Sequence, residues 1–176
     1  MELTFKETWT ALHGMVFGAA FLLLFSGGFV AIWNLGSSDL TPHAATRQLR
    51  RLSIGGWLMV LLVWAAIILG TYFIYPWYRA KPAAGASLVD YPKYLLLSKP
   101  QTADWHEFGM EWKEHVAWLT PILMTAVLWI VLFHGRLLVQ HVRLRRVVLF
   151  LFTVSFFCAS VAGVFGALIN KAAPTR

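Results

Sequence analysis

The chain has 176 residues, of which 59% are hydrophobic and 13% are charged, and its formal net charge is +7. A soluble domain of average composition contains roughly 25% charged residues, so this composition excludes an ordinary soluble core and indicates one membrane domain. The basic residues cluster at the ends of apolar runs, where they signal membrane topology, and this placement argues against a nucleic-acid-binding surface.

The first apolar run covers residues 11–35 and contains no charged residue. At a rise of about 1.5 Å per residue, a helix of this length crosses the roughly 30 Å of hydrocarbon in a bilayer. No basic segment and small-residue cleavage site mark it as a signal peptide, so we expect it to remain in the mature protein. Gly14 and Gly18 form a GxxxG motif, which lets a neighbouring helix or a flat cofactor approach closely, although glycine is also common in membrane helices generally.

Three further apolar runs predict membrane spans at residues 54–75, 112–133 and 147–169. The second ends at Pro76 beside a group of aromatic residues that is typical of a membrane interface. In the third, Pro121 removes one backbone hydrogen bond and predicts a kink. We therefore predict an all-α fold in which the whole chain forms a single transmembrane domain, a four-helix bundle.

The distribution of arginine predicts the orientation of this bundle. The two short connections, between the first and second spans and between the third and fourth, contain seven arginines and one acid, Asp39. Arginine-rich connections stay on the cytoplasmic side, so both termini and the long loop at residues 76–111 are expected outside. Prolines argue against a long regular element at the start of this loop, and Asp104 is placed to cap a helix that begins at Trp105.

Two histidines reach the same depth in this arrangement. His13 lies 22 residues before the inner end of the first span, and His115 lies 19 residues before the inner end of the third. Helices 1 and 3 of an up-down bundle face each other across the core, so these imidazoles predict a bis-histidine haem b near the outer boundary of the membrane. Gly14 and Gly18 would leave room for the porphyrin, and Phe17 would pack against it. The alternatives are a ligand role for another pigment or metal, and a structural role.

Two carboxylates accompany the second histidine of this pair. Glu111 precedes His115 by four residues, on the same helix face, where it is placed to accept the other ring proton of a ligating histidine. Glu114 is the adjacent residue. A quinol that is oxidised here must release two protons, which Glu111 and Glu114 are suited to accept. The alternative is a solvated amphipathic helix in which the glutamates pair with Lys113.

Other candidate chemistry is weaker. His134 is the best-placed ligand for a second haem, but its partner would have to come from the connection that contains His43, so one haem is favoured. The arginines around His134 are typical of a topology signal and of contact with anionic lipid headgroups. The single cysteine, Cys158, excludes a disulfide within the chain, and no zinc, phosphate-loop or serine-nucleophile motif is present.

The four spans and the paired histidines resemble those of the small four-helix b-type cytochromes of bacterial membranes. The chain also resembles uncharacterised four-span bacterial proteins whose first span opens with HGMVFG, here residues 13–18. This resemblance implies a multi-pass protein of the bacterial cytoplasmic membrane. Cytochrome b bundles often have two histidines on one helix or two stacked haems, a pattern that this chain does not clearly show.

These features together predict a membrane electron-transfer subunit that binds haem b and exchanges electrons between quinol and an outer cytochrome partner. If it is catalytic, it would be part of a quinol-linked oxidoreductase. The alternative is a non-catalytic accessory subunit of a respiratory or photosynthetic complex, in which the histidines only form hydrogen bonds. A third hypothesis is a pigment-binding protein with histidine on chlorophyll magnesium. The expected partners are membrane lipid and other subunits of a redox complex, not nucleic acid.

Overall fold

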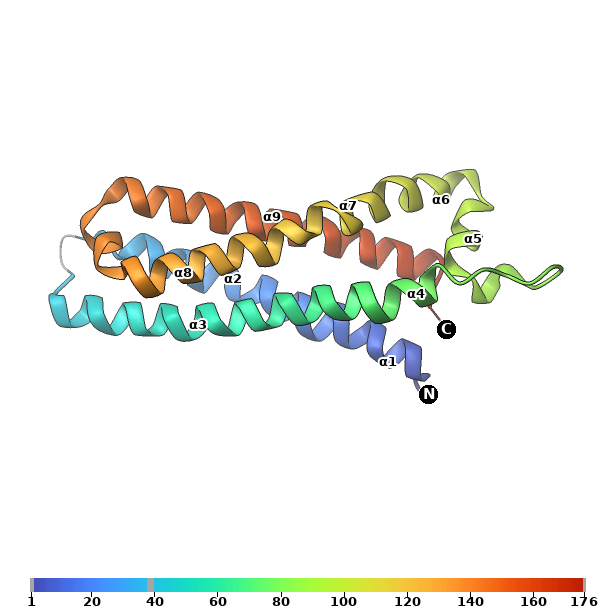
Figure 1. Ribbon diagram of the computed structural model, residues 1–176, viewed down its shortest axis with the longest axis horizontal. Helices are drawn as coiled ribbons and strands as arrows, with labels where there is room; N and C mark the ends of the chain where they lie inside the picture. Colours follow the sequence, from blue (N-terminus) through green and yellow to red (C-terminus); the bar gives the residue numbers. More distant parts are fainter. Residues whose placement is uncertain (1, 38–39, 176) are drawn as a thin grey trace.

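The structure, a computed structural model, describes residues 2–37 and 40–175 of the chain. Its main feature is a set of four helical rods, each long and apolar enough to cross a membrane, that pack as a bundle (Figure 1). The rods comprise Phe5–Asn34, Pro42–Tyr78, Pro100–Gln140 and Val142–Ala172. They contain the four predicted spans to within one residue, so the expectation of an all-α, four-span bundle is confirmed.

Three of the rods are composite, because α-helix gives way to π-helical or 3₁₀ turns within them. The first consists of α1 (Phe5–Ala11), the π-helical η1 (Leu12–Gly18) and α2 (Ala19–Asn34). The second consists of α3 (Pro42–Leu69), the π-helical η2 (Gly70–Ile74) and α4 (Tyr75–Tyr78). The third consists of α6 (Pro100–Asp104), the π-helical η4 (Trp105–Met110), α7 (Glu111–Glu114), the 3₁₀ turn η5 (Val116–Trp118) and α8 (Leu119–Gln140). The fourth is the single helix α9 (Val142–Ala172).

The first two rods begin at threonines that cap them. Thr4 Oγ1 accepts a hydrogen bond from the Glu7 N–H at 3.2 Å, and the Glu7 carboxylate accepts one from the Thr4 N–H at 2.8 Å, which forms a reciprocal capping box. The Thr41 side chain accepts the Ala44 N–H at 3.3 Å, and Pro42 occupies the first turn, where its missing N–H costs nothing. Both helix starts are therefore encoded by neighbouring residues.

The rods pack in chain order around a common core. Helix α2 contacts α3 and α9, and α8 contacts the same two helices, so the first and third rods lie diagonally across the bundle. The fully buried Phe21 and Phe152 are among the largest side chains of this core. Two glycines permit close packing, because a Cβ at Gly28 would lie 2.9 Å from the Phe152 ring and a Cβ at Gly56 would lie 2.9 Å from Leu128.

The third rod is broken between α7 and α8, as the position of Pro121 predicts. His115 has φ −117° and ψ −57°, and the next three residues form the 3₁₀ turn η5. Pro121 has no N–H to donate, and its ring clashes with the carbonyl four residues earlier, that of Ala117. A regular α-helix therefore cannot continue unbroken through this turn.

The long connection is more helical than expected at its far end. After α4 the chain forms the 3₁₀ turn η3 (Leu88–Asp90) and α5 (Pro92–Leu97), and the third rod then begins at Pro100. The expectation that Asp104 caps a helix starting at Trp105 is wrong, because Asp104 is the last residue of α6 and makes no side-chain cap. A proline suits the first turn of a helix, so Pro100 begins this rod earlier.

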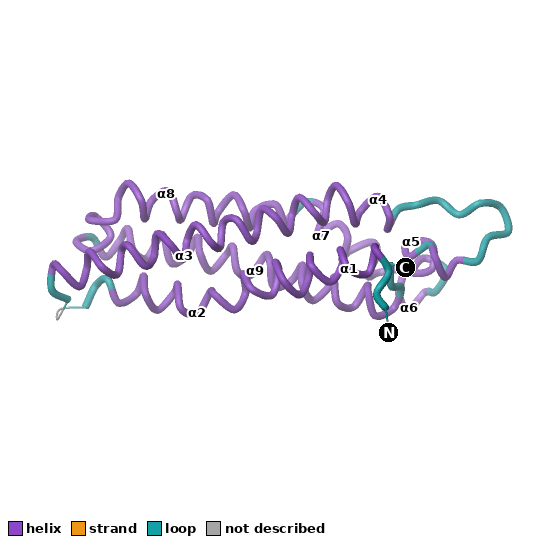
Figure 2. Tube along the Cα trace, turned by 90° about the horizontal axis from the view of Figure 1, so that it is seen from below, coloured by secondary structure: helices purple, strands orange, loops and turns teal. Residues whose placement is uncertain are grey.

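Both chain termini and the long connection lie at one end of the bundle (Figures 1 and 2). We call this the outer end; its assignment to the outer side of the membrane remains a prediction from the arginine distribution. At the opposite, inner end, Arg145 donates hydrogen bonds to the carbonyls of Leu138 and Val139 at 2.8 and 2.9 Å, and so caps the end of α8. Asp39 lies outside the described residues.

A second apolar cluster covers the outer end. Leu96 of α5, Tyr78 of α4, Met110 of η4 and Ile169 of α9 are all buried there. The short helices of the long connection thus pack against the outer ends of three rods.

A reciprocal hydrogen-bonded pair joins α8 to α9, and its removal tests the packing. Ser155 Oγ donates to the Thr120 carbonyl at 3.0 Å, Thr120 Oγ1 donates to the Ser155 carbonyl at 3.4 Å, and both residues are buried. We expect Ser155→Ala to lower the free energy of unfolding in detergent by about 1 kcal/mol, the usual value for such a bond between membrane helices. The control is Ser160→Ala, since Ser160 Oγ donates to Phe156 within its own helix. An equal loss of unfolding free energy in both variants would contradict the role of this pair in joining α8 to α9.

Candidate functional site at the outer end of the bundle

The irregular helical segments of this structure gather at the outer end. Segments η1, η2 and η4 are π-helical, and η5 is a 3₁₀ turn. π-Helix accounts for roughly less than 1% of residues in globular proteins and often marks functional sites. Within a membrane, irregular backbone is tolerated only where protein covers it or where it lines a cavity. The outer end is therefore the place to look for function.

His13 lies in η1 and packs against the second rod. Its Nδ1 is 2.8 Å from the carbonyl oxygen of Ala66, and a Cβ at Gly70 would lie 2.8 Å from its Cε1 atom. Only a glycine at this position leaves room for the ring. Because a carbonyl oxygen can only accept, Nδ1 must carry the proton, and Nε2 of the neutral ring is the free basic nitrogen.

Lys113 extends its amine into the bundle beside this histidine. Its Nζ would be 3.0 Å from a Cβ at Gly166 of α9, and it interacts electrostatically with His13. Within residues 2–37 and 40–175, no carboxylate pairs with this amine and no acceptor bonds to it. An ionisable group within a membrane bundle is costly and usually functional. The sequence pattern placed Lys113 on a solvated helix face. Its inward direction could have been predicted from its spacing, because Met110 and Ala117, three residues before it and four after it, are buried on the same helical stripe.

A network of polar side chains lies near Lys113 at the outer end, since Glu114, the next residue along the chain, belongs to it. The Tyr78 hydroxyl is 2.7 Å from His106 Nδ1, and the Arg79 guanidinium donates to the Tyr75 hydroxyl at 2.7 Å. Glu114 interacts electrostatically with both tyrosines and with His106. Apart from Arg79, which follows α4, these groups come from α4, η4 and α7, so the order of residues along the chain gives little indication of their proximity. Of the two glutamates singled out from the sequence, Glu114 is the one that joins this network.

Glu111 and His115 form a separate pair on the outside of the third rod. Their side chains are 70% and 69% exposed, and His115 Nδ1 lies 3.2 Å from Glu111 Oε2 and 3.1 Å from the Glu111 carbonyl oxygen. The contact agrees with the four-residue spacing. Whether Glu111 orients a ligating histidine remains a prediction.

The structure does not bring His13 and His115 together as a ligand pair. Each ring has its Nδ1 at a carbonyl oxygen, which leaves Nε2 free as an axial haem ligand would need. Their directions do not fit a shared haem, because His13 turns toward Gly70 while His115 is exposed. Lys113 lies two residues before His115 and takes the inward direction instead, since residues two apart point to different helix faces.

The remaining residues predicted to line a porphyrin surround His13. Gly14 is exposed, and a Cβ there would meet nothing within 4 Å, so the first rod is open to lipid at this point. A Cβ at Gly18 would lie 3.3 Å from the His13 carbonyl oxygen. Phe17 is half-buried. The first rod thus presents an open face to lipid at the residue next to His13.

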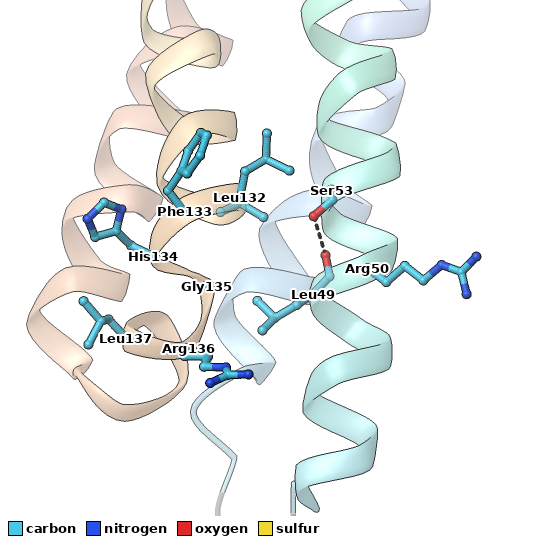
Figure 3. A pocket seen from close by; sticks show the side chains of 10 residues that line it. Leu49, Arg50, Ser53, Leu132, Phe133, His134, Gly135, Arg136 and Leu137 are labelled. Carbon is cyan, nitrogen blue, oxygen red and sulfur yellow. Dashed lines mark hydrogen bonds between the residues drawn. The ribbon is translucent and has the colours of Figure 1, made fainter.

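The other candidate histidines lie at the inner end. A cavity of about 300 Å³ lies between α3 and α8, and the side chains of His134 and Arg50, which line it, point away from each other (Figure 3). The α8 backbone departs from helical geometry at His134 (φ −124°, ψ 19°), whose Nδ1 is buried without a partner among the residues described. His43, at the start of α3, does not line this cavity. The cavity therefore does not pair His134 with His43.

No family model, curated protein or solved structure matches this chain. The fold and the site define its class by themselves: a four-span, all-helical membrane bundle with a lysine and a histidine inside its outer end. No particular family is assigned.

The unpaired amine of Lys113 leads to a prediction about the stability of the protein. Lys113→Met keeps the length of the side chain and removes a charge that has no buried partner, so we expect the free energy of unfolding in detergent to rise by about 1–3 kcal/mol. The matched control is Lys99→Met, an exposed position on the same side of the bundle, which should change stability by less than about 0.5 kcal/mol. A destabilised Lys113→Met protein would show that the amine has a structural role.

Proposed function

We propose that this chain is an electron-transfer subunit of a quinol-linked oxidoreductase in a bacterial cytoplasmic membrane, and that it binds quinol at its outer end. The observation that carries the proposal is the Lys113 amine, which lies inside the bundle next to His13 without an acidic partner among the described residues. An amine without a partner inside a membrane bundle is costly unless a ligand satisfies it. A quinone is an apolar molecule with two carbonyl oxygens, so it can enter from lipid and accept a hydrogen bond from an amine.

The two inward groups have complementary roles in this proposal. The Lys113 ammonium donates a hydrogen bond to one quinone oxygen, and the free Nε2 of His13 accepts the proton of a quinol hydroxyl. Ala66 holds the histidine in the required tautomer, and the glycine at position 70 lets its ring pack against the second rod. The open face at Gly14 is the route from the lipid.

Oxidation of quinol to quinone releases two protons and two electrons, and each needs an exit. The network of Glu114, Tyr75, Tyr78 and His106 begins at the residue that follows Lys113, and its hydroxyl, imidazole and carboxylate groups are suited to proton transfer toward the outer surface. Glu111, on the exposed face, would act only in the outer water. The electrons pass to an outer cytochrome or to another redox subunit, which is the partner that this function requires.

Haem b held by His13 and His115 remains a separate hypothesis. When bound, haem supplies one-electron redox chemistry, which would link quinol to the partner. As described above, His115 faces outward, so the side chains as arranged here do not fit a haem between these two residues. The proposed reaction therefore does not include haem, and the proposed quinol site consists of Lys113 and His13.

An accessory, non-catalytic subunit is the second candidate. It is favoured by the hydrogen bond between His13 and Ala66, which joins the first and second rods and would stabilise the bundle without any ligand. This function gives the Lys113 amine no partner, which is why we prefer quinol binding.

Quinone binding tests the proposal directly. In lipid nanodiscs, a short-chain benzoquinone should quench tryptophan fluorescence saturably, and Lys113→Met should raise its Kd about tenfold or more, because a hydrogen bond from a charged donor is lost. Lys99→Met is the control and should bind as the wild type does. Glu114→Gln should leave binding intact but slow quinol oxidation by the purified complex more than Glu111→Gln does. Equal Kd values for wild type and Lys113→Met would refute the quinol site.

A reduced-minus-oxidised visible spectrum of the purified protein tests the haem hypothesis. If haem b binds as the sequence predicts, an α-band appears and is lost in both His13→Ala and His115→Ala. Because His115 is exposed and turned toward Glu111, we expect His115→Ala to leave any haem signal unchanged. Loss of the band in that variant would show that His115 turns inward when haem binds. A chlorophyll spectrum would instead support the pigment-binding hypothesis.

A further inference from the structure

A second cavity, of about 330 Å³, lies in the inner half of the bundle, away from the quinol site. It extends from the interface of α2 and α3 into the core, where α8 and α9 close it. Its lining is almost entirely apolar and includes Gly27, Gly28, Gly55, Gly56 and Met124.

The glycines of this cavity fall into two kinds. Gly28 and Gly56 are in close contact with the core, since a Cβ at either would lie 2.9 Å from a side chain of α9 or α8. Gly27 and Gly55 face open space, because a Cβ at either would meet nothing within 4 Å. Gly27 is also exposed on the surface of the bundle. The cavity is therefore a groove whose mouth lies at Gly27 and Gly55, open to the surrounding lipid.

The apolar lining of this groove favours a hydrocarbon chain as the occupant. An apolar cavity offers water no hydrogen-bond partners, and a pocket of this kind stays dry or takes an apolar ligand. Packing inside proteins is dense, and an unfilled space of this size loses dispersion contacts on every side. A groove that opens onto a bilayer can be filled by an acyl chain without any rearrangement of the helices.

One charged residue stands at the edge of the groove. Arg51 is four residues before Gly55 on α3, so its side chain lies on the same helix face, and it is exposed. Within the described ranges, which leave out residues 38 and 39, no acidic side chain pairs with it. An arginine near the membrane surface extends its guanidinium to the headgroup level, where it can bind phosphate with two parallel hydrogen bonds.

We propose that this groove binds one acyl chain of an anionic phospholipid, whose phosphate pairs with Arg51. The charge of the inner end supports this occupant over a neutral lipid or a quinone tail, because anionic lipids are attracted to arginine-rich cytoplasmic surfaces and a quinone headgroup offers the guanidinium no anion. The bound chain fills the space between the first two rods and becomes part of the packed bundle. The inference is independent of the quinol site.

Native mass spectrometry of the full-length protein tests the proposal. Released from nanodiscs with equal amounts of phosphatidylglycerol and phosphatidylcholine, the wild type should retain one phosphatidylglycerol. Arg51→Gln should reduce the preference for phosphatidylglycerol about tenfold, as expected for the loss of a charge-assisted contact. Arg146→Gln removes the same charge from the inner end at a residue outside the groove, and it should keep the preference.

Filling the groove is the second test. Gly27→Leu and Gly55→Leu place a side chain where there is open space, so the bundle should fold while the retained lipid is lost. Gly163→Leu, at an exposed position of α9 outside the groove, is the matched control and should retain the lipid. Retention of phosphatidylglycerol by both groove variants would overturn the proposal.

A third measurement needs no variant. Phosphatidylglycerol with a diazirine in its acyl chain should cross-link the wild type at Met59 and Met124, which line the groove. Cross-links spread evenly over lipid-facing residues such as Phe150 and Phe157 would show only general solvation by lipid and would contradict the assignment. Capture of a quinone, or of equal amounts of both lipids, would also contradict it.

Discussion

Backbone hydrogen bonding in hydrocarbon is the constraint on which the rest of this structure depends. An unpaired N–H or C=O costs several kcal/mol in lipid, so a chain that crosses a bilayer must pair these groups within each helix. This requirement explains why the rods continue through η1 and η2 as π-turns instead of opening into loops. It also explains why the Arg145 guanidinium donates hydrogen bonds to the last carbonyls of α8, because the helix itself supplies no further N–H donors there. The side chains that remain are free to face lipid, and large apolar residues such as Phe150 do so.

The two ends of the bundle satisfy this constraint in different ways. In the inner half the helices approach closely at Gly28 and Gly56, and its irregular backbone and buried polar atom are confined to His134 of α8 among the described residues. The outer end has irregular turns, a covering layer of short helices, and a lysine and a histidine in its interior. Such groups lower stability, and natural proteins tolerate this loss at sites of binding and catalysis. The division of the molecule into a packing end and a chemical end thus follows from where the polar side chains lie.

The sequence predicted the features that depend on length and on local chemistry. The four apolar runs predicted the four rods, because the length of a span follows from the thickness of the hydrocarbon. Pro121 predicted the break before α8, because a proline disrupts the turn that precedes it. The cap predicted at Asp104 failed because a stronger local signal, Pro100, starts the helix earlier. Of the site, the sequence found His13 and Glu114 but gave Lys113 and Tyr78 no role in it. The contact between Tyr78 and His106 joins residues 28 apart across the long connection, and no periodicity encodes it.

The position of Lys113 shows that the depth and the direction of a side chain in a membrane helix are separate predictions. Depth along a rod follows from the rise per residue, and a few irregular turns change it little. Direction around the axis follows from the number of residues per turn, and each π-turn, with bonds from i to i+5, adds a residue and rotates everything beyond it. The buried stripe of α8 continues backward at helical spacing through Ala117 to Lys113, whereas His115 falls on the exposed stripe with Leu119. The charge of Lys113, and not the spacing, is what made a solvated face the expected place for this side chain. The backbone places the amine inside and the imidazole outside, and this placement determines which chemistry the outer end can perform.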